Sequence, residues 1–263
     1  ASEGWLSLIA GQLSNSLQGR IAANQQLKMQ AQQVDNHSQG RIYSQQAGVE
    51  LKAGTLSNHE GLIQARTDLN LEVAGRASNR GGQLLSEQGT VSLRAESLDN
   101  RSGILTSMLG RLKTVVRGVF SNQSGTVQGH RVELLAGELA NQQGHVAATT
   151  GDLDLFVATL NNQGGGLYAQ QQLKLTGHEL DNSSHGQIAG QSIDFGLSGA
   201  LNNSSGLIEA DTLQLSSTRL NNRDGRLRAL ATTGHSLIIS AADLDNRNGL
   251  IEIGNQDFTL DVP

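Results

Sequence analysis

The sequence predicts an all-β fold, a right-handed parallel β-helix (solenoid) of about 12 rungs, with about 21 residues and three short strands per rung. Three observations predict it: a phrase that recurs twelve times, side chains whose polarity alternates with a period of two, and near absence of proline. The phrase is an aliphatic residue, another residue and an Asn, with a Gly three or four positions after the Asn. A fixed short period is typical of stacked repeats.

The recurring Asn sets the period. Its copies are spaced by 19 to 24 residues, with a mean of 21. They are Asn15, Asn36, Asn58, Asn79, Asn100, Asn122, Asn141, Asn162, Asn182, Asn203, Asn222 and Asn246. We therefore expect one continuous repeat array over residues 1–263, and we expect it to be a fragment of a longer filament because the pattern begins and ends in mid-repeat.

Within one repeat, the clearest unit is residues 201–215, which contains the stretches Leu201-x-Asn203, Ile208-x-Ala210 and Leu213-x-Leu215. A period of two predicts strands with alternate side chains on opposite faces. Gly, Ser or Asn between the stretches predicts turns. Each strand should pair with its copies in the neighbouring rungs, about 4.8 Å away.

Aligned repeats give columns of similar residues. Two positions after the Gly, every repeat has an aliphatic residue: Ile21, Ile42, Ile63, Leu84, Leu105, Val127, Val146, Leu167, Ile188, Ile208, Leu227 and Ile251. Two positions further, all residues but Ile253 are small. These columns predict the core of the coil, with mostly polar residues facing out.

The Asn alternates with the aliphatic residue before it, so we expect its side chain to point inward at a corner. A buried amide needs hydrogen bonds, and identical Asn residues one rung apart can bond one another. The sequence therefore predicts a structural Asn ladder, and it predicts that the Gly supplies the backbone freedom that the corner needs.

Composition excludes several classes of protein. Only 3% of the residues are aromatic, there is no Cys, and the single Pro is residue 263. Continuous ladders need this shortage of Pro, which has no N–H to donate. A net charge of −5 without a basic face argues against nucleic-acid binding. No apolar run is long enough for membrane insertion, and we predict no cofactor.

Candidate chemistry is sparse. Asp154, Lys174 and Asp194 share a column, but a solvated charge stripe explains them better than catalysis, since spread acids and short loops leave no cleft. His37 and His59 occupy adjacent rungs, but two ligands make a weak metal signal, and their column is otherwise polar. We predict no catalytic, cofactor-binding or metal residues. Gly164, Gly165 and Gly166 are attributed to corner geometry, since no Lys-Ser/Thr follows as in a phosphate loop.

Two segments break the rhythm. Residues 104–119 do not fit the strand register, which predicts a bulged or bent rung. That segment concentrates Arg111, Lys113 and Arg117, a candidate partner-binding patch. The longest repeat interval, near Thr232 and His235, predicts a protruding loop.

The phrases Leu98-Asp99-Asn100-Arg101-Ser102-Gly103 and Leu220-Asn221-Asn222-Arg223-Asp224-Gly225 resemble the haemagglutinin repeats of filamentous haemagglutinin and of contact-dependent growth inhibition exoproteins. The resemblance covers essentially the whole chain. It implies export through an outer-membrane β-barrel transporter (two-partner secretion) and a place at the outer cell surface of a Gram-negative bacterium. It implies no catalytic residues.

Three hypotheses for function follow. The first is a structural shaft segment of a secreted or cell-surface exoprotein, either an adhesin or a toxin-delivery filament. The second is a module in such a filament that binds a receptor or glycan on a host or neighbouring cell. The third is a carbohydrate-active β-helix enzyme, which would need long loops or a cleft with several acids and bases. The sequence identifies neither a receptor nor a toxin.

Overall fold

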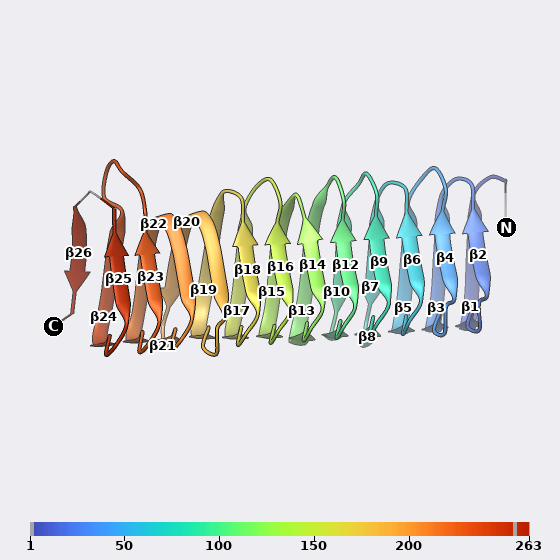
Figure 1. Ribbon diagram of the computed structural model, residues 1–263. Coiled ribbons are helices and arrows are strands. Elements are labelled where there is room, and N and C mark those ends of the chain that lie inside the picture. Colours follow the sequence, from blue (N-terminus) through green and yellow to red (C-terminus); the bar gives the residue numbers. More distant parts are fainter. Residues whose placement is uncertain (1–2, 255–256, 263) are drawn as a thin grey trace. The chain divides into compact units, whose positions relative to one another are not determined.

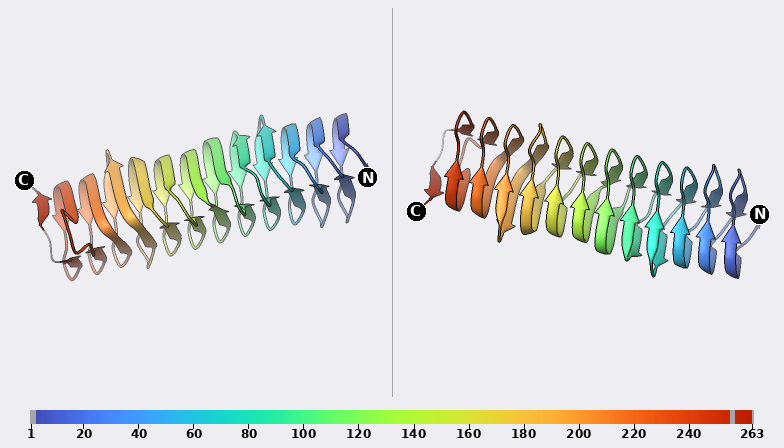
Figure 2. Two further views of the ribbon diagram at one scale, coloured as in Figure 1. Left: turned by 90° about the horizontal axis from the view of Figure 1, so that it is seen from above. Right: turned by 90° about the horizontal axis from the view of Figure 1, so that it is seen from below.

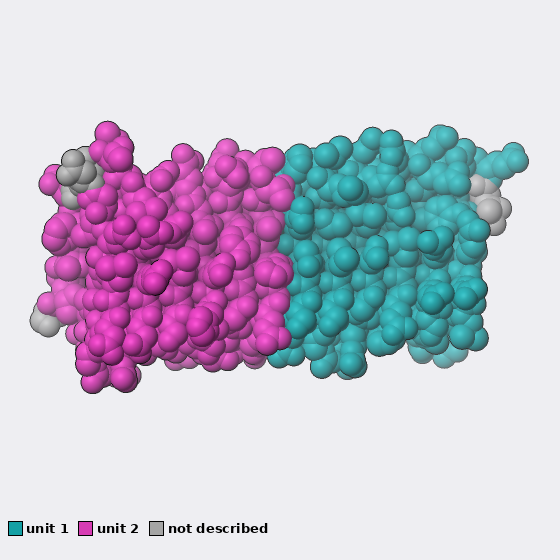
Figure 3. All heavy atoms as spheres, viewed as in Figure 1, with its two compact units in different colours: residues 1–137 teal, residues 138–263 magenta. Residues whose placement is uncertain are grey.

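The computed structural model describes residues 3–254 and 257–262 as a parallel β-solenoid of about twelve turns (Figure 1). The chain forms two compact units, residues 1–137 and residues 138–263 (Figure 3). The prediction of a single continuous array over residues 1–263 stays a prediction. Among the described residues, no helix is long and apolar enough to cross a membrane.

Strands account for most of both units. Those that begin in the first unit are β1 (Leu6–Ser14), β2 (Arg20–Ala23), β3 (Leu27–Asp35), β4 (Arg41–Ser44), β5 (Val49–Ser57), β6 (Leu62–Ala65), β7 (Leu69–Val73), β8 (Arg76–Ser78), β9 (Gln83–Ser86), β10 (Val91–Ala95), β11 (Ser97–Asp99), β12 (Ile104–Ser107), β13 (Arg111–Ser121), β14 (Thr126–Gly129) and β15 (Arg131–Ala140). Those of the second unit are β16 (His145–Ala148), β17 (Leu153–Asn161), β18 (Gly166–Ala169), β19 (Gln172–Asp181), β20 (Gln187–Leu197), β21 (Ala200–Asn202), β22 (Leu207–Asn221), β23 (Arg226–Ala229), β24 (Leu237–Asp245), β25 (Leu250–Ile253) and β26 (Phe258–Asp261).

Most turns contain one long and one short strand. The sequence shows three stretches of side-chain alternation in each repeat. The stretch after the small residue usually continues into the Leu-x-Asn stretch of the next repeat, and the two form one long strand, as in β3 and β17. They separate in β7 and β8 and again in β10 and β11. In β22 all three stretches form one strand of 15 residues. The side-chain alternation within such a long strand is interrupted where two successive residues, such as Gln32 and Gln33, are both exposed.

Each strand pairs in parallel with its copy one turn away, and Figure 2 shows the strands of each unit side by side in chain order. Val49 of β5, for example, lies opposite Leu27 of β3 and Leu69 of β7. Because equivalent residues are opposite one another, every inward column stacks like on like, and the alternation seen in one repeat is enforced in the next.

The core consists of these inward columns. The predicted aliphatic column of the short strands is fully buried from Ile42 to Val127 and from Val146 to Leu227. In the next column, the hydroxyls of Ser44, Ser86 and Ser107 donate to carbonyls of the turns beside them. A small residue is needed here because the chain turns around it, and a hydroxyl also satisfies a turn amide, as Gly110 N–H does with Ser107 Oγ at 3.1 Å.

The prediction for residues 104–119 is right about a bulge and wrong about the strand register before it. Leu112, Thr114 and Val116 of β13 are buried, and residues 112–116 pair in register with β10. Val116 lies opposite Ala95 but Phe120 lies opposite Leu98, so β13 has one extra residue between these positions, as in a β-bulge. The polar Thr114 at a core position hid the alternation in the sequence. Met108 and Leu109 are not strand residues: they lie exposed in the turn before β13.

Candidate functional site

The twelve Asn side chains are the most regular polar feature of both units. In the first unit each amide donates from Nδ2 to Oδ1 of the Asn one turn further, at 2.7 Å, for Asn15, Asn36, Asn58, Asn79 and Asn100. In the second unit, Asn141, Asn162, Asn182, Asn203 and Asn222 do the same at 2.7–2.8 Å. Ten of the twelve are fully buried, which makes this an interior ladder.

Each ladder amide also holds the corner of the chain. Asn79 Nδ2, for example, contacts Gly82 O at 3.2 Å and Ile104 O at 3.0 Å besides Asn100 Oδ1. The amide therefore satisfies buried carbonyls of its own turn and of the next. Since each such group is costly to leave unpaired, the ladder fixes where every short strand begins.

The corner glycines are not needed for the backbone freedom that the sequence predicted. Gly61 does not adopt a positive φ; the residue before it, Glu60, does, with φ 56°. A side chain on Gly61 would collide with the backbone oxygen of Asn36 and the amide of Asn58. Gly is thus required for close approach to the ladder, and the preceding residue takes the left-handed conformation. Only Gly81 and Gly164, in the position before a corner glycine, combine a Gly with positive φ at that turn.

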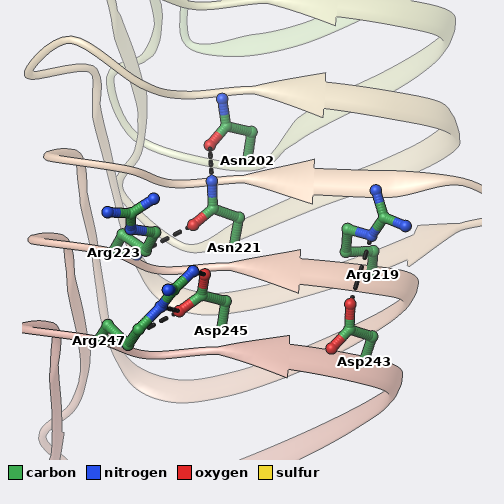
Figure 4. Close-up of polar contacts among 7 residues, drawn as sticks. All are labelled: Asn202, Arg219, Asn221, Arg223, Asp243, Asp245 and Arg247. Carbon is green, nitrogen blue, oxygen red and sulfur yellow. Dashed lines mark hydrogen bonds and ion pairs between the residues drawn. The ribbon is translucent and has the colours of Figure 1, made fainter.

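A second, outward ladder was missed in the sequence. It consists of the residues just before the buried Asn, which lie in register: Asn161, Asp181, Asn202, Asn221 and Asp245. Asn221 donates to Asn202 Oδ1 at 3.0 Å (Figure 4). Asn202 in turn donates to Asp181 Oδ1 at 3.1 Å. The sequence signal for this outer ladder was the Asp or Asn that directly precedes the ladder Asn in the phrase Leu-Asp/Asn-Asn.

Arginines following the ladder Asn bind this outer column. Arg247 clasps Asp245 with Nε at 2.9 Å and Nη2 at 2.5 Å, and its backbone N–H also donates to Asp245 (Figure 4). The Arg247 side chain is the main reason that the pKa of Asp245 is lowered to about 2. Arg101 holds Asp99 in the same way and lowers the pKa of that buried carboxyl.

The strand registers place the residues of the predicted charge stripe in one column. Lys174 is opposite both Asp154 and Asp194, and its Nζ is 3.9 Å from Asp194 Oδ2. Similar pairs are Lys28 with Glu50 and Lys52 with Glu72, each at 3.3 Å. These side chains are substantially exposed, so each pair contributes little to stability.

The residues proposed as a partner patch are spread along β13. Lys113 Nζ is 2.6 Å from Glu133 Oε1, and Arg117 Nη1 is 3.7 Å from Glu96 Oε2. Arg111 is exposed at the start of the strand. Two of the three cations are thus neutralised by neighbouring turns, and a partner role for this patch stays a prediction.

The two histidines on adjacent turns are on the surface. His37 bonds its neighbour Ser38 at 2.9 Å, and His59 faces Glu60 at 3.5 Å. Within residues 3–254 and 257–262 no three His, Cys, Asp or Glu residues are grouped as metal ligands would be. The long turn between β23 and β24 exposes Thr232, Thr233 and His235.

The outer surface has several grooves, among them one in each unit. The first, about 570 Å³, crosses four turns beside the corners of β2, β4, β6 and β9. The second, about 880 Å³, lies beside the turn after β18 and the middle of β20, and is lined by small residues with Tyr168, Gln170, Gln171, Gln191 and Asp211. Tyr168 lies over Gly166 and stacks on His145, with ring centroids 6.3 Å apart, and burial raises the pKa of its hydroxyl.

Stacked parallel turns, a buried Asn ladder and an outer surface of exposed charges define the class of protein: a parallel β-solenoid built from repeats. The family model for the haemagglutinin repeat matches residues 1–107, 114–155, 148–196 and 192–248. The chain therefore belongs to the haemagglutinin-repeat family, whose repeats are generally structural and non-enzymatic and are typical of filamentous haemagglutinin-type bacterial exoproteins. No curated protein matches the chain, and no solved structure does.

Proposed function

We propose that this chain is a structural shaft segment of a large bacterial exoprotein, either an adhesin or a contact-dependent toxin-delivery filament. The observation that carries the proposal is the repetition of one turn architecture: the same inward columns and the same Asn contact recur across both units. In a repeat array, length is set by the number of turns, so such a segment serves to hold other parts at a distance.

Two features of the chain suit an exported protein and support the same role. The chain has no Cys, and its stability rests on ladders that form turn by turn. A chain of this kind can pass unfolded through an outer-membrane β-barrel transporter and fold at the outer surface of a Gram-negative cell. The transporter is the partner we propose for secretion, through a region of the parent outside this chain.

The test uses whole-turn deletions in the intact exoprotein. Removing residues 58–78, one complete repeat, should leave secretion and adhesion or toxin delivery close to normal, because the corner contacts re-form one turn closer. Loss of activity with normal secretion and folding would show that these residues have a specific role and would overturn a purely structural one. A deletion of residues 201–219 in the second unit, which joins Ala200 to Leu220 and is again one repeat long, provides the matched comparison.

A further inference from the structure

One pair of charged residues breaks the pattern of the outer faces. Arg20 of β2 and Arg41 of β4 lie directly opposite each other. In several other registers that join two charged residues the charges are opposite, as for Lys28 and Glu50 or Arg219 and Asp243. Like charges directly opposite on neighbouring strands destabilise a sheet. The arginine pair therefore places a like-charge repulsion on this face of the sheet.

The pair is held in place rather than left loose. Arg20 Nη2 donates to the Tyr43 hydroxyl at 2.7 Å, and its guanidinium lies 5.8 Å from the centre of that ring. The buried amide of Asn15 contacts Gly19 O at 3.1 Å and Arg41 O at 3.0 Å. The interior ladder thus fixes the backbone from which both arginines project, about 4.8 Å apart.

Neither arginine has an acid partner among the described residues. No carboxylate there forms an ion pair with Arg20 or Arg41, whereas arginines such as Arg66, Arg101 and Arg247 each have one. The nearest candidate in the groove, Glu60, faces His59 instead. The guanidiniums are exposed, so their N–H donors are open to a ligand.

Both arginines line the groove of about 570 Å³ in the first unit. Its other polar side chains are Gln18, Gln39, Glu60 and Gln83, and Gly40, Gly61, Gly81 and Leu62 complete its lining. The groove follows the stacking direction across four turns, a length of about 14 Å at 4.8 Å per turn. Its shape suits an extended ligand better than a compact ion.

We propose that Arg20 and Arg41 bind an acidic group, a carboxylate or sulfate, of a linear oligosaccharide lying along this groove. An oxyanion between two guanidiniums cancels their repulsion and accepts charge-assisted hydrogen bonds from both. Gln18, Gln39 and Gln83 offer amides for the hydroxyls of neighbouring sugar units. A membrane surface fits less well, because the guanidiniums lie in a groove with the carboxylate of Glu60 beside them.

The experiment measures binding of a linear galacturonic acid hexamer to the 263-residue chain by calorimetry at low salt. We expect binding that weakens about tenfold or more in Arg20→Gln and in Arg41→Gln, the scale of losing one charged hydrogen bond. Arg226→Gln, which removes the same charge from the equivalent exposed position at the start of β23, is the matched control and should bind as the unmodified chain does. Glu60→Gln should bind severalfold more tightly.

Thermal unfolding provides a second readout. Without ligand, Arg41→Gln should melt at the same temperature as the unmodified chain or higher, because a repulsion is removed. The hexamer should raise the melting temperature of the unmodified chain and leave that of Arg41→Gln unchanged. This separates loss of a ligand contact from loss of folding.

Four outcomes overturn the proposal: equal binding by both arginine variants, equal binding of a neutral glucose hexamer, binding to phosphatidylglycerol vesicles but not to the hexamer, and binding of inorganic sulfate without the hexamer, which would indicate an adventitious ion only. None of them bears on the role as a shaft segment, which rests on the repeats.

Discussion

At the scale of the residue, a single amide organises each turn. The ladder Asn has two donor hydrogens and an oxygen, and in Asn79 all of them are engaged, with Asn58 donating to its oxygen. Neither Gln nor Asp can replace it: Gln is too long for the corner, and ionised Asp has no donors. This explains why the same residue type recurs twelve times in a sequence that otherwise tolerates many substitutions.

Asn79→Ala should lower the free energy of unfolding by about 2–4 kcal/mol, because Asn58 loses its acceptor and the carbonyls of Gly82 and Ile104 lose a donor. Ser78→Ala, one residue away and partly exposed, is the control and should change it by no more than about 0.5 kcal/mol. Denaturant unfolding measures both. Similar effects for the two variants would contradict a stabilising ladder.

The outer ladder predicts an acid limit to stability. The folded pKa of Asp245 is about 2, below an unfolded value of about 3.9, so its contribution is complete above pH 4 and is lost as the pH falls toward 2. Arg247→Gln should raise this pKa toward the unfolded value, as followed by carboxyl ¹³C chemical shifts. Arg223→Gln should raise it less, since Arg223 acts only through its charge. An unchanged Asp245 titration in Arg247→Gln would contradict the assignment.

At the scale of the element, the sequence predicted the inward columns and a bulge in β13 but misjudged the register of residues 112–116. The aliphatic columns were predictable because identical positions repeat at one spacing and each is buried. That register was not, because Thr114 places a hydroxyl where other turns have an aliphatic residue such as Leu93. The corner glycines were misread for a physical reason too: a sequence shows that Gly is required but not whether φ or space requires it.

The cost of a buried hydroxyl at this core position can be tested at Thr114. Its hydroxyl is fully buried and has no hydrogen-bond partner among the described residues. Thr114→Val keeps the shape, removes the unpaired group and should raise the free energy of unfolding by about 1–2 kcal/mol. Thr106→Val on the outer face of β12 is the matched control and should have little effect. A destabilised Thr114→Val would show that the hydroxyl has a partner.

At the scale of the whole molecule, the repeat spacing predicted the architecture, whereas the outer surface resisted prediction. Register follows from the repeat, so Lys174 opposite Asp194 could be anticipated. The groove around the arginine pair on β2 and β4 could not, because the sequence does not show which turns line it. The right-handed sense stays a prediction from the general rule for such crossovers.

Modularity is the property of the whole molecule that is most open to test. Deleting residues 58–78 joins Ser57 to Asn79, so Asn36 meets Asn79 and the inward columns remain aligned. We expect this variant to fold, with circular dichroism per residue unchanged and a melting temperature within a few degrees of the parent. Deleting residues 58–68 instead removes half a turn and joins Ser57 to Leu69, which breaks the corner and sends core residues to the surface. That variant should lose protection from hydrogen exchange in the neighbouring strands; two equally stable variants would contradict the one-turn repeat as the folding module.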